Sequence, residues 1–89
     1  MKVKVSVYAT LREKLGWKRK EVEVKKNTTI RDVLEKLPDL SGKVLDKSGE
    51  LVEGMIVLLN GLNIKGLEGL NTKVKDGDEI DIFPPAGGG

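Results

Sequence analysis

The chain has 89 residues, the size of one small domain, and its 16 basic and 14 acidic residues give a net charge of +2. Because cysteine and histidine are both absent, disulfides, thiol catalysis and zinc knuckles are excluded, and the usual general base of an enzyme is missing. No apolar run reaches the ~18 residues of a membrane span, and the lysines near the N-terminus do not fit a signal peptide, so the sequence predicts a cytoplasmic protein without a membrane partner.

The beginning of the chain predicts a strand, a short helix and a second strand. Residues 2–8 (KVKVSVY) alternate between polar and apolar side chains, which places the valines on the core face of a strand. Residues 9–15 (ATLREKL) predict a short helix, with Gly16 as its C-terminal cap. Alternation returns over residues 20–25, and we expect the two strands to pair antiparallel.

The next element is a helix over residues 29–37. Thr29 and Asp32 have the spacing of a capping pair at its start. Four apolar side chains recur at helical spacing and form one stripe: Ile30, Val33, Leu34 and Leu37. Pro38 is expected to stop the helix, and residues 39–54 then form a connection that holds at most a helical turn around residues 42–47.

A hairpin follows the connection. Residues 55–59 (MIVLL) are a nearly unbroken apolar run, as expected of a strand that is covered along much of its length. Asn60-Gly61 comes directly after it and is a strong hairpin signal, so residues 62–64 predict a short return strand.

The last strand is predicted over residues 79–83, after a turn at residues 76–78. Pro84-Pro85 end this strand, because neither proline can donate to a sheet ladder. The order of elements predicts an α+β domain over residues 1–83, with the main helix laid across the sheet, and a tail over residues 84–89. The side chains expected to share one core are Val3, Val5, Val22, Ile30, Val33, Leu34, Leu37, Val57, Leu59, Ile80 and Ile82.

Charge is distributed unevenly along the chain. Residues 1–26 hold nine basic and three acidic residues, a net of +6, and residues 27–89 hold seven basic and eleven acidic residues, a net of −4. A basic face suits RNA, but no aromatic or arginine platform accompanies the lysines. Solvated strand edges are therefore the favoured interpretation, and nucleic acid is not an expected partner.

Catalytic and metal-binding motifs are missing. No nucleotide-binding loop is present, and the serines have no suitable base, so we expect a protein that is not itself an enzyme. Asp76, Asp78 and Asp81 lack the frame of a calcium loop and are interpreted as turn and strand residues, so no metal is expected. The absence of glutamine, with lysine and glutamate dominant among the charged residues, favours a thermophilic source.

The glycines at the end of the sequence are the remaining candidate for function. One interpretation is an inert, disordered terminus. The other is that the α-carboxylate of Gly89 is itself the reactive group. Glycine has no Cβ, so a glycine strand can thread a narrow channel in a partner, and the six residues from Pro84 reach at most ~20 Å. The carboxylate, with an ordinary pKa of about 3.3–3.7, is ionised at neutral pH and can attack the α-phosphate of ATP.

With these features the sequence resembles the MoaD/ThiS family of ubiquitin-like sulfur carriers and the related small archaeal modifier proteins. The resemblance is carried by residues 5–11 (VSVYATL), 57–64 (VLLNGLNI) and 74–89 (VKDGDEIDIFPPAGGG), and the connection over 39–54 favours the MoaD-like or archaeal-modifier branch. It implies a β-grasp fold: a five-stranded mixed sheet in the order 2-1-5-3-4, one main helix packed across it, and a flexible Gly-Gly tail. Gly87 departs from the family pattern, which usually has a non-glycine residue directly before the Gly-Gly pair.

The resemblance also implies a chemistry. A ThiF/MoeB-like activating enzyme would use MgATP to adenylate the Gly89 carboxylate, a sulfur donor would convert it to a thiocarboxylate, and the chain itself would bind no cofactor. The sulfur would go to the large subunit of molybdopterin synthase or to a tRNA-thiolation enzyme, and other relatives form isopeptide bonds with lysines of target proteins. The residues assigned to partner binding are Phe83, Pro84 and Pro85 beside the channel mouth, and Gly87 and Gly88 within it. The alternative is a non-catalytic β-grasp binding module, with a protein or RNA partner and an inert tail.

Overall fold

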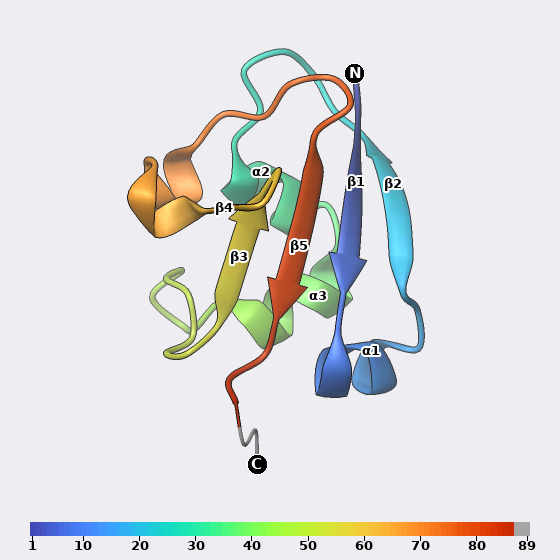
Figure 1. Cartoon of the computed structure of the whole chain (residues 1–89), viewed down its shortest axis with the longest axis vertical. Helices are drawn as coiled ribbons and strands as arrows, with labels where there is room; N and C mark the ends of the chain where they lie inside the picture. Colours follow the sequence, from blue (N-terminus) through green and yellow to red (C-terminus); the bar gives the residue numbers. More distant parts are fainter. Residues whose placement is uncertain (87–89) are drawn as a thin grey trace.

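Five strands form one mixed sheet in the computed structural model, which describes residues 1–86. The strands are β1 (Lys2–Val7), β2 (Arg19–Glu23), β3 (Ile56–Leu59), β4 (Leu62–Asn63) and β5 (Glu79–Phe83). Their spatial order is β2-β1-β5-β3-β4 (Figure 1). β1 and β5 pair in parallel in the middle of the sheet, and the other neighbours pair antiparallel. The predicted β-grasp fold and strand order are confirmed.

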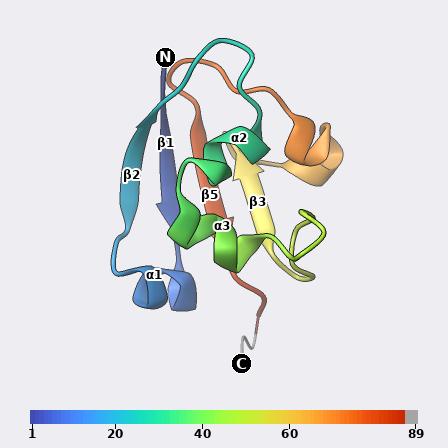
Figure 2. The ribbon, with the colours of Figure 1, turned by 180° about the vertical axis from the view of Figure 1, so that it is seen from behind.

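Helices cover one face of this sheet. The α-helices are α1 (Ala9–Leu15), α2 (Ile30–Glu35) and α3 (Pro38–Val44), and the 3-10 helices are η1 (Ile64–Gly66) and η2 (Gly69–Asn71). α2 and α3 lie across the same face, as seen from behind in Figure 2. The predicted cap of α2 is confirmed: the Asp32 amide donates to Thr29 Oγ1 at 3.2 Å, and the Thr29 amide donates to Asp32 Oδ2 at 3.0 Å. α1 ends at Gly16, whose φ of 79° is the left-handed conformation expected of a C-terminal cap.

Pro38 begins a helix instead of leading into a loop with one turn. Proline suits the first position of a helix, because the amide hydrogen that it lacks would have no partner there. Leu40 and Val44, one turn apart in α3, are completely buried, so this helix is part of the core. Leu37, which we placed in the core stripe of the preceding helix, is only partly buried because it forms the junction between α2 and α3.

The core lies between the sheet and these helices. Apart from Leu37, every side chain predicted for the core is buried. Further buried apolar side chains come from the ends of strands, from α1 and α3, and from the segment that contains η1 and η2: Val7, Leu11, Val24, Leu40, Val44, Met55, Ile64, Leu70 and Val74. Among residues 1–86, no helix has the length and hydropathy of a membrane span.

The apolar strand β3 is covered on one side only, contrary to our expectation. Val57 and Leu59 are buried, whereas Ile56 is 42% exposed and Leu58 is half-buried. Successive side chains of a strand point to opposite faces, so these two residues lie on the face of the sheet opposite α2 and α3. The turn after β3 is as predicted, because Asn60 and Gly61 both have the positive φ that a two-residue type I′ turn requires. The return strand is one residue shorter than predicted, since β4 ends at Asn63 and Ile64 begins η1.

Candidate functional site

The predicted partner-binding residues that the structure describes form the end of β5 and the segment after it. Phe83 is the last residue of β5, Pro84 and Pro85 follow it, and all three are half-buried. β5 ends at the opposite end of the sheet from the N-terminus (Figure 1). Gly87, Gly88 and the reactive candidate Gly89 lie outside the described residues, so their roles stay predictions.

Phe83 is held by an aromatic partner from the neighbouring strand. Its ring stacks on that of Tyr8, with centroids 4.4 Å apart and an interplanar angle of 10°. Tyr8 follows β1 directly, and because β1 and β5 are parallel neighbours, both rings emerge at the same end of the sheet. The Arg12 guanidinium carbon lies 5.1 Å from the centroid of the Tyr8 ring and adds a cation–π contact.

The Tyr8 hydroxyl is fixed as well. It donates to Asp81 Oδ1 at 3.0 Å. This hydrogen bond is the largest cause of a raised pKa for the Tyr8 phenol, and burial and the negative charge of Asp81 raise the pKa further. The phenol therefore remains a protonated donor at neutral pH, and the ring stays in place beside Phe83.

Two residues of β3 extend this aromatic pair into an apolar surface. In the antiparallel register of β3 and β5, Ile56 is opposite Phe83 and Leu58 is opposite Asp81. We call the surface formed by Tyr8, Ile56, Leu58 and Phe83 the open-face patch. An exposed apolar surface of this kind, bordered by charges, is typical of a protein–protein contact. It lies directly beside the root of the tail.

The acidic and basic clusters of the sequence have ordinary structural partners. Asp76 Oδ1 accepts from the Lys2 amide at 2.8 Å, Asp78 Oδ2 accepts from the Lys75 amide at 2.7 Å, and Asp81 accepts from Tyr8. Among residues 1–86, no group of three or more acidic side chains is placed to hold a metal ion. The hydrogen bonds of the three aspartates support their interpretation as turn and strand residues.

The basic residues of β2 are also engaged within the chain. Arg19 Nε donates to Ser6 Oγ at 2.9 Å, and Lys20 Nζ lies 4.8 Å from the centroid of the Trp17 ring. Glu21 and Glu23 follow these basic residues in the same strand, so β2 carries both signs of charge. This arrangement favours a solvated strand edge over a phosphate-binding surface.

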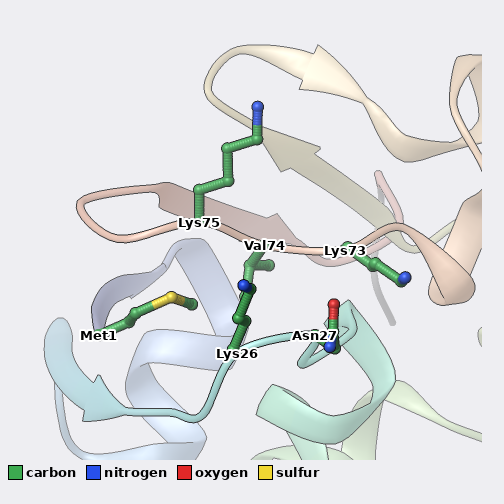
Figure 3. Close-up of a pocket in the computed structure, with 6 residues that line it drawn as sticks. All are labelled: Met1, Lys26, Asn27, Lys73, Val74 and Lys75. Atoms are coloured by element: carbon green, nitrogen blue, oxygen red, sulfur yellow. The ribbon is translucent and has the colours of Figure 1, made fainter.

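A hollow of about 280 Å³ lies at the far end of the molecule from the open-face patch. Its lining residues are Met1, Lys26, Asn27, Lys73, Val74 and Lys75 (Figure 3). The amino groups of Lys73 and Lys75 point away from each other in Figure 3, so these cations do not converge on one position. Lys73 and Lys75 therefore do not form a common anion site in this hollow.

Sequence reasoning missed Tyr8, Ile56 and Leu58 as parts of the site, although signals for them were present. The whole chain has only one tyrosine, one phenylalanine and one tryptophan, and two of these stack here. In the alternating sequences of their strands, Tyr8 and Phe83 both stand at positions of the polar series. Their large apolar rings therefore lie on the face of the sheet away from the core. The unbroken apolar run of β3 was a third signal of the same kind.

A five-stranded sheet with β1 and β5 parallel at its centre and a helix packed across one face is the arrangement of small ubiquitin-like proteins. The chain belongs to the ThiS family, whose sequence model matches residues 5–89. It is 34% identical to small archaeal modifier protein 3 of Haloferax volcanii over the full length of both chains. It is 36% identical over 73 residues to a protein from Archaeoglobus fulgidus that is named as a candidate sulfur carrier, covering 78% of this chain and 82% of the relative.

The crystal structure of SAMP1 from Haloferax volcanii superposes with a TM-score of 0.86 at 31% identity, and the superposition covers all of both chains. The resemblance seen in the sequence is therefore confirmed. Like these relatives, the chain is a small ubiquitin-like carrier or modifier protein and not an enzyme.

Proposed function

We propose that the Gly89 carboxylate is adenylated by a ThiF/MoeB-like partner enzyme and is then converted to a thiocarboxylate for sulfur transfer. The observation that carries the proposal is the position of the open-face patch at the root of the tail. A partner that covers Tyr8, Ile56 and Phe83 receives the chain that follows Pro85 next to the same surface. The similarity to modifier protein 3 and to the Archaeoglobus protein supports this class of function.

Activation would be a nucleophilic substitution at the α-phosphorus of ATP, with pyrophosphate as the leaving group. A carboxylate oxygen of Gly89 attacks the α-phosphorus of MgATP held by the partner enzyme, the bond between the α-phosphorus and the bridging oxygen breaks, and pyrophosphate leaves. The product is an acyl-adenylate, in which AMP is a good leaving group. The carboxylate is ionised at neutral pH, so it needs no base from this chain.

Sulfur transfer would follow at the acyl carbon. The terminal sulfur of a persulfide on a donor protein attacks this carbon and AMP leaves, which gives an acyl disulfide. A second thiol of the donor system then cleaves the S–S bond, is itself oxidised to a disulfide, and leaves Gly89 as the thiocarboxylate. Molybdopterin synthesis, through the large subunit of molybdopterin synthase, and tRNA thiolation are the two destinations that we propose for this sulfur.

Conjugation is the second outcome of the same activated group. A lysine amine of a target protein attacks the acyl carbon, AMP leaves, and the amine loses its proton to solvent, so an isopeptide bond forms. Similarity over the full length to modifier protein 3 favours this role beside sulfur transfer. The glycines suit both reactions, because the absence of Cβ leaves the acyl carbon open to either nucleophile.

The test is to incubate the purified chain with the activating enzyme of its own source, MgATP and a persulfide donor, and to measure the intact mass. Replacing one oxygen by sulfur adds about 16 Da, whereas conjugation leaves a branched peptide on the lysine of a target. The alternative, a β-grasp binding module with an inert tail, predicts no mass change. It also predicts that deleting Gly88 and Gly89 leaves partner binding intact.

A further inference from the structure

A tight turn precedes β3 and lies against the root of the tail. The Met55 amide donates to the Val52 carbonyl oxygen at 3.0 Å, which closes a four-residue turn. Gly54 is the third residue of this turn and has a φ of 86°. A positive φ at the third position is the requirement of a type II turn, and glycine meets it without strain.

Gly54 also has a second constraint, which comes from the tail. A Cβ built on Gly54 would lie 2.9 Å from Pro85 Cβ and 3.1 Å from Pro85 Cγ. Real Cβ atoms do not approach other carbons this closely, and a proline ring cannot rotate out of the way as a long side chain can. The Pro85 ring therefore packs on the bare backbone of Gly54, which holds the chain immediately before Ala86.

Other glycines of the chain show that this contact is particular to Gly54. Gly77 has nearly the same φ, 84°, and a Cβ built there meets nothing within 4 Å. Gly16, with a φ of 79°, is equally open. A side chain at either position would impose the backbone strain of a positive φ but would not touch the tail.

We propose that the turn from Val52 to Met55 is a positioning seat for the tail, and that Gly54 is a positioning residue for activation of Gly89. This inference rests on the proposed function. Beyond Pro85 only four residues remain, which extend at most ~14 Å. A displacement of the Pro85 ring therefore changes the direction in which a short tether leaves the domain. Because misplacement of a reacting group by about 1 Å can cost a large part of a rate, the seat contributes to activation without touching the partner's ATP.

The first test needs no partner enzyme. In the wild-type chain we expect nuclear Overhauser contacts between the Gly54 α-protons and the Pro85 ring, and Gly54→Ala should abolish them and shift the Ala86 amide resonance. Gly77→Ala is the matched control and should leave both signals unchanged. The melting temperature should fall by a few degrees in both variants, because both carry a Cβ at positive φ, and it should fall further in Gly54→Ala, which also loses the packing of the Pro85 ring. The absence of the contact in the wild-type chain would overturn the seat.

The second test measures ATP–pyrophosphate exchange by the activating enzyme. We expect Gly54→Ala to lower kcat roughly 10-fold with little change in KM, since the open-face patch is intact, and we expect Gly77→Ala to match the wild type. An equal loss of kcat in both variants would show that backbone strain in the turn is the cause, and it would contradict the proposal. A normal kcat for Gly54→Ala would contradict the proposal too. If the wild-type chain is not activated at all, the proposed function fails, while the resonance test still decides the seat.

A double-mutant cycle separates the contact from other effects. Pro85→Gly removes the two atoms nearest to a Cβ at position 54, Pro85 Cβ and Cγ, and keeps the third nearest, Pro85 Cα, at 3.6 Å. If the ring contact is the cause, Gly54→Ala should add no further loss of kcat in the Pro85→Gly background. Additive losses would show that Gly54 acts independently of Pro85 and would overturn the seat.

Discussion

At the scale of single residues, Tyr8 supports Phe83, the last residue of β5 before the tail. Its ring stacks on Phe83, and its hydroxyl donates to Asp81, the residue two positions earlier on the same strand. The two contacts act on different ends of one side chain and fix the ring that supports Phe83. A rigid aromatic pair loses little conformational entropy on binding, which suits a docking surface.

We predict that Tyr8 titrates above its ordinary pKa of 10.0 in the folded chain, chiefly because its hydroxyl donates to Asp81. With the folded pKa raised above the unfolded value, this group's contribution to stability is complete below about pH 10 and is lost as the pH rises through the folded pKa. Tyr8 is the only tyrosine, so the ultraviolet absorbance of phenolate reports it alone. In Asp81→Ala, which removes the acceptor, the midpoint should move back towards 10.0, and an unchanged midpoint would contradict the stated cause.

Gly54 shows why part of the site could not be predicted from the sequence. Its neighbours indicate only a turn, and the contact with Pro85 joins segments far apart along the chain. Thr29 and Asp32 are the opposite case, because their capping contacts span a single turn and are readable from spacing alone.

At the scale of elements, α3 depends on tertiary packing more than on its own sequence. The segment PDLSGKV contains a proline, a glycine and a serine, so its helix propensity is poor and the sequence indicated mostly a connection. Burial of Leu40 and Val44 on one side stabilises the helix regardless. By contrast, the boundaries of β5 were predicted correctly, because its alternation is strict and prolines follow it directly.

We predict that Leu40→Ala lowers the free energy of unfolding by ~2–5 kcal/mol, since it leaves a cavity under a completely buried side chain. Leu37→Ala should cost clearly less, because Leu37 is only partly buried at the junction of α2 and α3. Urea denaturation of the two variants measures both values. If Leu37→Ala lowers the free energy of unfolding as much as Leu40→Ala, the apolar stripe of α2 continues to Leu37. That result would contradict the packing described for α3.

At the scale of the whole molecule, the sheet separates two tasks. One face carries α2 and α3 (Figures 1 and 2) and supplies the core. The other carries the open-face patch beside the root of the tail. The apolar run of β3 contributes to both faces: Val57 and Leu59 pack in the core, whereas Ile56 and Leu58 belong to the open-face patch. The apolar run signalled apolar side chains on both faces of the strand, but its pattern could not show that one face is uncovered, because an apolar residue on an open face is identical in pattern to one that is covered.

We predict that Ile56→Asp raises the KM for activation about 10-fold or more, because a charge would be placed within the apolar contact, directly beside Phe83. Leu67→Asp is the matched control: Leu67 is 41% exposed, nearly the same as Ile56, and lies between η1 and η2. Steady-state kinetics with varied carrier concentration measures both variants. Equal effects of the two substitutions, or a normal KM for Ile56→Asp, would show that the open-face patch is not the docking surface.

The most direct measurement of the central claim is the intact mass of the chain after reaction with its activating enzyme, MgATP and a persulfide donor. We predict formation of pyrophosphate and a gain of about 16 Da that maps to Gly89. Gly88→Val should block this gain without unfolding the domain, because a branched side chain beside the terminus obstructs a narrow channel. An unchanged mass at Gly89 under every condition, together with no ATP–pyrophosphate exchange, would contradict the proposed function and leave a β-grasp binding domain.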